Sequence, residues 1–158
     1  MSSKVLESTN AYNCAPSGVI AANEDIFDGD PATDVVSMEN YETIVWYIIK
    51  NAGATGTATI TVESCDDTTP STATAIAFHY RATTSGNTRG AVTAATSAGF
   101  TTTAGANQIY EIEVSAEALS AGDKFVRMQC TEVANNPCDG AIMQVMHGPR
   151  FGHEDVTS

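Results

Sequence analysis

Long hydrophobic runs are missing from this chain of 158 residues. The longest, residues 44–49, contains six residues, whereas a helix that spans a membrane needs about 20. The first ten residues, MSSKVLESTN, also lack the apolar stretch that is typical of a secretory signal. The sequence therefore predicts a soluble protein with no membrane contact.

Basic residues are scarce as well. Seven Lys and Arg stand against 19 Asp and Glu, which gives a net charge of −12. Proteins bind nucleic acid largely by neutralising phosphates with Lys and Arg, so this balance argues against a nucleic-acid partner. The acidic surplus instead favours a protein partner whose surface is basic.

Recognisable catalytic motifs are absent from the sequence. His79, His147 and His153 are too far apart for a zinc motif such as H-x-x-x-H, and no serine lies in a G-x-S-x-G elbow. General acid–base catalysis needs groups within hydrogen-bond reach, and no motif places them there. We therefore expect a protein that is not an enzyme and that needs no cofactor.

Acidic side chains gather in residues 24–34, around a glycine and a proline, and again after residue 65. The members of these two groups are Asp25, Asp28, Asp30, Asp34, Asp66 and Asp67. Their oxygens could bind Ca²⁺, but their spacing differs from the D-x-D-x-D-G pattern of a calcium loop. A solvated acidic loop is the favoured interpretation, and no metal site is predicted.

Only four cysteines are present, and they form no C-x-x-C metal pattern. They are Cys14, Cys65, Cys130 and Cys138. Buried free thiols are the favoured interpretation, because unpaired cysteine often packs in protein cores. The alternative is a disulfide between Cys130 and Cys138, which would need a suitable Cβ separation across the turn at residues 135–137.

Strand alternation is the strongest pattern in the sequence. Across residues 57–64, Ala58, Ile60 and Val62 alternate with threonines, as a half-buried antiparallel strand requires. Residues 43–50, TIVWYIIK, are apolar on both faces, which predicts a central strand that is buried on both sides or covers a subunit contact on one. A tight hairpin through residues 51–53 is expected to join these two strands.

Further short strands are predicted along the chain between turn signals. They cover residues 19–22, 34–38, 73–82, 90–94, 108–114, 125–133 and 141–147. The last two are expected to pair as a hairpin, and residues 83–107 to form a long loop around an edge strand. Residues 115–123 offer one helical turn at most, ended by Gly122.

This arrangement predicts an all-β fold, a two-sheet antiparallel β-sandwich. Spacing leaves the jelly-roll and immunoglobulin-like strand orders open, because both bury alternating residues between two sheets, and a jelly-roll-like order is the one we prefer. The domain is expected to cover residues 19–151, preceded by an extended, irregular N-terminal arm at residues 1–18 and followed by a tail at residues 152–158.

Four blocks occur along the chain in a recognisable order: YETIVWYIIKNAGATGTATITVESCDD, IYEIEV, DKFVRMQC and GPRFG. Together they resemble the small β-sandwich proteins that decorate the heads of tailed bacteriophages, the decoration or cement proteins. The resemblance covers residues 34–151 and is most specific in residues 44–63, a strand, a glycine-rich turn and a threonine-alternating strand.

The resemblance implies a structural virion protein that binds the outside of an assembled capsid and stabilises contacts between capsomers. Its implied partners are the major capsid protein and further copies of itself, with a trimer favoured and a dimer possible. It would be made in the host cytoplasm and end on the outer surface of the virion.

Contact residues are expected in the arm and near the chain end, where hydrophobic side chains stand among polar ones. They are Val5, Leu6, Tyr12, Pro149, Arg150 and Phe151. These segments would order against a neighbour through β-addition or a hydrophobic anchor, and disorder is the alternative.

Two other functions fit the same fold pattern, an exported module that binds glycans or cell surfaces and a tail or head-fibre subunit. Trp46 and Tyr47 could form an aromatic platform for a sugar. Their position within a strand of Ile and Val favours roles in the core and on the sheet face instead.

Overall fold

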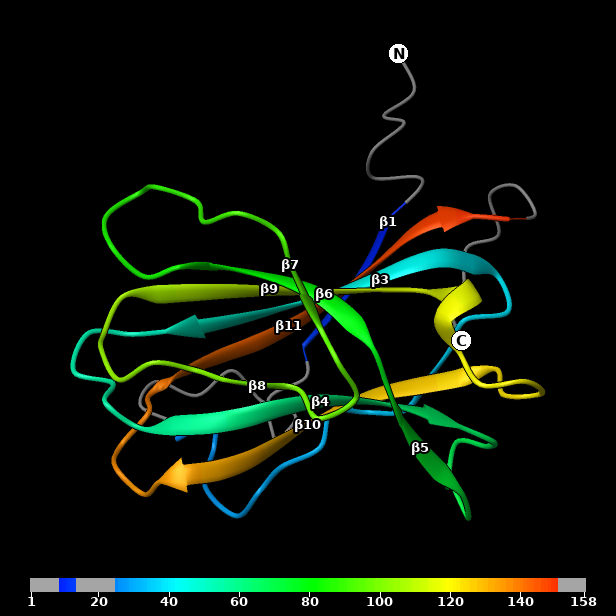
Figure 1. The fold of residues 1–158 in the computed structure, drawn as a ribbon, viewed down its shortest axis with the longest axis horizontal. Helices are drawn as coiled ribbons and strands as arrows, with labels where there is room; N and C mark the ends of the chain where they lie inside the picture. The colour runs from blue at the N-terminus through cyan, green and yellow to red at the C-terminus, as the bar shows by residue number, and fades with distance from the viewer. Residues whose placement is uncertain (1–8, 14–24, 151–158) are drawn as a thin grey trace.

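The computed structural model describes residues 9–13 and 25–150. Within these residues the chain forms eleven strands and one short 3-10 helix. The strands build two antiparallel sheets that pack face to face, as Figure 1 shows. The predicted all-β sandwich is therefore confirmed.

The larger sheet has six strands in the order β1-β11-β3-β9-β6-β7. Their bounds are β1 (Thr9–Asn13), β3 (Tyr41–Lys50), β6 (Phe78–Thr83), β7 (Thr93–Ala95), β9 (Gln108–Ser115) and β11 (Gly140–Pro149). Strand β3 lies between β11 and β9, so the central position predicted for residues 43–50 is confirmed.

The smaller sheet has the order β2-β10-β4-β5, and β8 also pairs with β4. Its strands are β2 (Val36–Ser37), β4 (Thr57–Cys65), β5 (Ala73–Ile76), β8 (Phe100–Thr101) and β10 (Phe125–Ala134). The helix η1 (Ala116–Ala118) follows β9 and ends before Gly122, whose φ is +95°. Among the described residues, no helix is long and apolar enough to cross a membrane.

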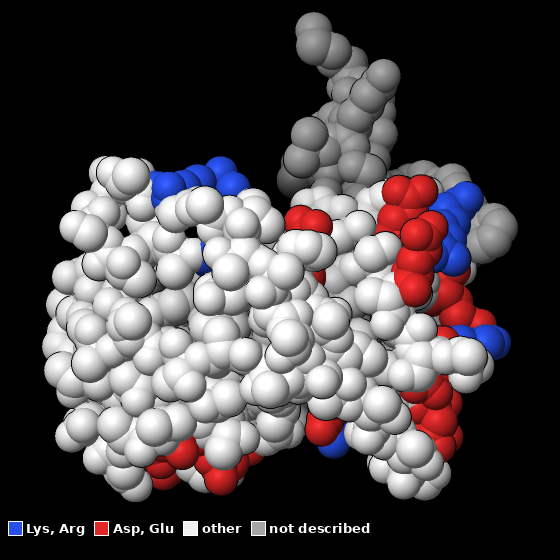
Figure 2. Space-filling view, viewed as in Figure 1, with Lys and Arg blue, Asp and Glu red and all other residues white. Residues whose placement is uncertain are grey.

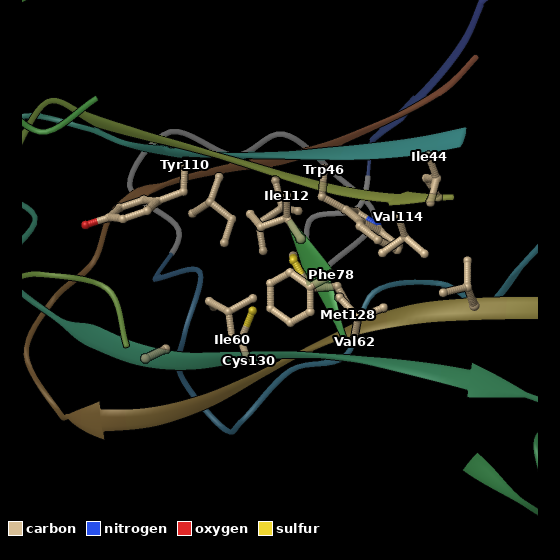
Figure 3. Packing of buried hydrophobic residues seen from close by; sticks show 14 of the residues in the cluster. Ile44, Trp46, Ile60, Val62, Phe78, Tyr110, Ile112, Val114, Met128 and Cys130 are labelled. Carbon is tan, nitrogen blue, oxygen red and sulfur yellow. The ribbon is translucent and has the colours of Figure 1, made fainter. Parts of the chain in front are cut away.

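The core lies between the two sheets and draws on the inward-facing positions of both (Figure 3). From the larger sheet come Ile44, Trp46, Phe78, Tyr110, Ile112 and Val114, and from the smaller sheet Ile60, Val62, Met128 and Cys130. Phe100 joins the core at one edge, where its ring stacks on Tyr80 with centroids 3.8 Å apart. Because both sheets share one continuous cluster, neither can lose its partner without exposing apolar surface.

Both predicted hairpins are wrong. Strand β3 pairs with β9 and β11, while β4 pairs with β10 in the opposite sheet, so residues 51–56 cross between the layers. Strand β11 likewise lies in the larger sheet and β10 in the smaller one. Consecutive strands that each have one strongly apolar face can bury those faces against each other across the core, and here this packing replaces direct pairing.

The strand predicted at residues 73–82 is two strands, β5 and β6, which lie in different sheets. The chain leaves the sheet pattern only at Ala77. Ile76 and Phe78 on either side of it are both buried in the core cluster. The alternating pattern therefore continues through the corner, and periodicity alone gives no sign that the chain changes layers.

Other boundaries also differ from prediction. Within the predicted long loop, the edge strand is at Thr93–Ala95 instead of residues 90–94, and β8 was not predicted. Residues 9–13 are not irregular, since they form β1 and pair with β11 at the sheet edge. The rest of the predicted arm, the tail at 152–158 and the strand predicted at 19–22 lie outside the described residues.

Candidate functional site

The outer face of the larger sheet carries charged, histidine and tyrosine side chains at its centre. Because side chains alternate along a strand, residues 43, 45, 47 and 49 of β3 face away from the core. The register places Val45 beside Glu113 and Tyr47 beside Glu111 of β9. On the next strand, His79 lies opposite Glu113 and Arg81 opposite Glu111.

These side chains line a groove of about 400 Å³. Its lining comes from four strands and from the loop between β6 and β7: Thr43, Val45, Tyr47, His79, Tyr80, Arg81, Val92, Glu111, Glu113 and His147. Val92, on the loop, keeps 65% of its surface exposed, which is the largest exposure of any large hydrophobic side chain in the described residues. Apolar and polar groups thus meet in one concave surface, which is common in ligand sites.

Glu111 is the electrostatic centre of the groove. It pairs with Arg81 on the neighbouring strand and with Arg89 on the β6–β7 loop, whose Nε lies 3.3 Å from Glu111 Oε1. Only 11% of the Glu111 side chain is exposed, so both ion pairs are partly shielded from water. The hydrogen bond to Glu111 also raises the pKa of the Arg81 guanidinium.

Of the predicted contact residues, Tyr12, Pro149 and Arg150 lie on or directly after the neighbouring strands β1 and β11 of this sheet. Strand β1 runs antiparallel to β11, which places Thr9 opposite His147 and Tyr12 opposite Gln144. Pro149 ends β11, and the Arg150 backbone N–H donates to Asn40 O at 2.8 Å. The remaining three predicted contact residues, Val5, Leu6 and Phe151, lie outside the described residues.

Hydrogen bonds connect the acidic loop to strand β10. Asp30 accepts the Glu132 backbone N–H at Oδ1 (2.6 Å), and its carbonyl accepts the Gln129 side-chain amide at 2.7 Å. Asp66, on the turn after β4, accepts hydrogen bonds from Ser71 and Thr72. In the described part of the chain, no group of three or more His, Cys, Asp or Glu side chains could hold a metal ion.

The remaining sequence candidates take structural positions. Trp46 is fully buried and donates from Nε1 to Gln144 Oε1 at 2.9 Å, so it cannot serve as a sugar platform. Tyr47 faces the groove. Cys65, Cys130 and Cys138 are buried free thiols, and the alternative of a disulfide between Cys130 and Cys138 is wrong. Cys14 lies outside the described residues.

Sequence reasoning missed most of the groove. Glu111 and Glu113 alternate along β9, and His79 and Arg81 along β6, so each pair shares one face of its strand. Opposite charges at matching positions of two strands are a signal for pairing, but it can be used only once the two strands are known to be neighbours.

Comparisons with protein-family models, with curated proteins and with solved structures found no match to this chain.

Proposed function

We propose that the protein is a structural component of a tailed-phage virion that binds the outside of the assembled capsid and stabilises contacts between capsomers. The observation that carries the proposal is the corner where the start of β1 lies beside the end of β11. Thr9 at the start of β1 lies opposite His147, two residues before the end of β11 at Pro149. We infer that the chain before β1 and the chain after β11, which carry most of the predicted contact residues, bind the same partner, the major capsid protein.

The charge distribution supports a surface made for protein contacts. Although the net charge is −12, residues 90–110 contain no Lys, Arg, Asp or Glu. Figure 2 shows a largely uncharged front surface, with most acidic side chains toward one end, beside basic ones, and along the lower rim. A neutral face lets copies approach without the repulsion that the total charge would cause, which supports a homo-oligomer. The preference for a trimer over a dimer rests on the family resemblance alone.

The strand order supports the jelly-roll-like part of the proposal. Successive strands alternate between the sheets at β1, β2, β3 and β4, and again at β9, β10 and β11. Such alternation is typical of a double-sheet jelly roll.

The proposed mechanism is stabilisation by differential binding. A protein that binds the expanded shell better than its unexpanded form stabilises the expanded shell by the difference in binding free energy. Many copies on one shell add up, so each contact can be weak. No catalytic step, nucleic-acid contact or membrane contact is part of this function, and the protein would remain on the outer surface of the virion.

The experiment is to mix the purified protein with undecorated heads assembled from the major capsid protein of the same genome, and to measure occupancy by sedimentation. Deleting residues 1–8, which leaves β1 in place, and Phe151→Ala should both lower occupancy. Val133→Ala is the matched control, because Val133 is 60% exposed on β10 in the other sheet.

Failure of the intact protein to bind heads would reject the proposed function. Full occupancy by the deletion and Phe151→Ala variants would instead remove the corner from the mechanism. Circular dichroism of each variant checks that the sandwich is still folded.

A further inference from the structure

The groove on the outer face of the larger sheet has a composition that suits a particular ligand. Its floor contains the half-buried ring of Tyr47 and the side chain of Val45, and its lip carries the exposed Val92. Around them stand Glu113 and His79, which offer hydrogen-bond acceptors and donors. We propose that this groove binds a neutral saccharide, with the Tyr47 ring as the stacking surface.

The charged side chains that line the groove argue against an anionic ligand. The guanidinium groups of Arg81 and Arg89 are both engaged by Glu111, so binding an anion there would have to break an existing ion pair. Glu113 forms no salt bridge within the described part of the chain and would repel a phosphate, a sulfate or a sialic acid. A hydroxyl-rich, uncharged molecule fits this balance because it can use both kinds of polar group.

The groove wall is held in position before any ligand binds. The β6–β7 loop is tied to the sheet by the Arg89–Glu111 ion pair and by the Gly90 backbone N–H, which donates to Ala82 O at 2.9 Å. Figure 2 shows basic side chains over this loop, at the upper left. Pre-ordered walls lower the entropy cost of binding, which matters for a ligand that forms weak contacts.

A second copy of this chain is the competing occupant. The same sheet face also carries two apolar side chains that are each 38% exposed, Met143 opposite Tyr47 and Ile109 opposite Ile49. A stable protein interface needs about 800 Å² from each partner, which would have to extend well beyond the groove. The groove's mixture of tyrosine rings with acidic, basic and histidine side chains favours the smaller, polar ligand.

Saccharide binding goes beyond the proposed capsid role and is tested on the isolated protein, so either can fail while the other holds. The probe is an array of immobilised neutral, sialylated and sulfated oligosaccharides, followed by calorimetric titration with the neutral oligosaccharide that is best retained. We expect retention of neutral oligosaccharides. Tyr47→Ala should weaken binding about tenfold or more, while Tyr47→Phe, which keeps the ring, should stay within about threefold of the parent.

Two further variants keep the test decisive. Val92→Asp adds a charge to an exposed lip without disturbing the core, and should also weaken binding if Tyr47→Ala fails to fold. Val133→Ala, on the opposite sheet, should leave binding unchanged.

Three results would overturn the proposal. The first is that no neutral oligosaccharide is retained. The second is that only charged glycans are retained, or that binding survives both Tyr47→Ala and Val92→Asp. The third is a concentration-dependent self-association, measured by sedimentation velocity, that Tyr47→Ala abolishes without any saccharide binding, since this would assign the face to a second copy.

Discussion

Gly99 is required by the close approach of two backbones. It has a φ of +76°, and a Cβ added there would lie 2.0 Å from Ile60 O on β4. The glycine therefore lets residues 100–101 pair with β4 as strand β8. Gly86 also has a positive φ, +59°, but nothing lies within 4 Å of its added Cβ.

These two glycines allow a matched comparison. Gly86→Ala should lower the free energy of unfolding by about 1–2 kcal/mol, which is the cost of a left-handed backbone conformation for a residue with a Cβ. Gly99→Ala adds a clash with backbone atoms, and should lower the free energy of unfolding by about 1–3 kcal/mol more. Urea denaturation of both variants measures the difference, and equal losses would show that the β8 segment moves away freely.

The surroundings of Glu132 disfavour the charged form of its carboxyl group. Burial raises the pKa of its carboxyl above the ordinary value of 4.5, and the carboxylates of Asp25, Asp28 and Asp30 add to the rise. Its Oε1 has no hydrogen-bond partner within the described residues. A folded-state pKa above the unfolded one means that ionised Glu132 lowers stability.

Glu132→Gln should therefore raise the melting temperature at pH 7. The gain should shrink as the pH falls through the raised pKa, and should vanish below about pH 4.5, where both states of the parent are protonated. Glu117→Gln, an equal charge change on the exposed helix η1, serves as control and should change the melting temperature much less. A gain for Glu132→Gln that is the same at all pH values would contradict this account.

At the scale of the element, a buried lysine links three segments at one end of the sandwich. Lys50, the last residue of β3, is 1% exposed, and its Nζ donates to Gly56 O and to Thr103 O, each at 2.9 Å. Burial lowers the pKa of its amine. The side chain thus connects the end of β3 with the residue before β4 and with the segment after β8.

Lys50→Met keeps the side-chain volume but leaves both carbonyls without this donor. We expect a loss of about 1–3 kcal/mol in the free energy of unfolding, measured in urea at pH 7. Lys124→Met is the control, because Lys124 forms an exposed ion pair with Glu39 and should contribute little. A more stable Lys50→Met variant would show that the cost of burying the charge exceeds the value of its hydrogen bonds.

The elements themselves were largely predictable, whereas their partners were not. Alternation along β4 and the apolar run of β3 depend on local burial, which sequence records directly. Whether β3 turns back on β4 or crosses to the other sheet depends on the remote strands β9 and β11, and no local pattern carries that information. For the same reason, the sequence did not predict that the strand ends at Ala77 and that the chain passes to the other sheet there.

At the scale of the whole molecule, one shared core predicts one cooperative transition. Burial raises the pKa of Cys130 to about 12 and that of Cys138 to about 11, and it also raises the pKa of Cys65. All three thiols are buried. They should be protonated and shielded at pH 8, and therefore unreactive in the folded protein.

Alkylation with iodoacetamide across a urea series tests this cooperativity. Cys65 and Cys130, which lie on neighbouring strands of the smaller sheet, should become labelled at the same urea midpoint as Cys138. Peptide mass spectrometry separates the sites, and loss of tryptophan fluorescence from Trp46 gives an independent midpoint. Labelling of one site well before the others would reveal a locally unfolding part.

The groove on the larger sheet also depends on both local and remote parts of the sequence. Tyr47 was recognised from the sequence as an aromatic residue on a strand, but Glu111 and Arg81 gained meaning only from the pairing of β9 with β6. A groove is a property of several strands and one loop together. The contact residues of the arm and tail stay a prediction, and no sequence pattern indicates the pairing that brings β1 beside β11.

The pairing of β1 with β11 would allow a circularly permuted chain. Since β1 begins beside the end of β11, a short linker from residue 150 to residue 9 would turn these two strands into an ordinary β-hairpin. New ends could open within the exposed residues 84–88. Such a circular permutant would replace the longest-range strand pairing by a local one, and lower contact order favours faster folding.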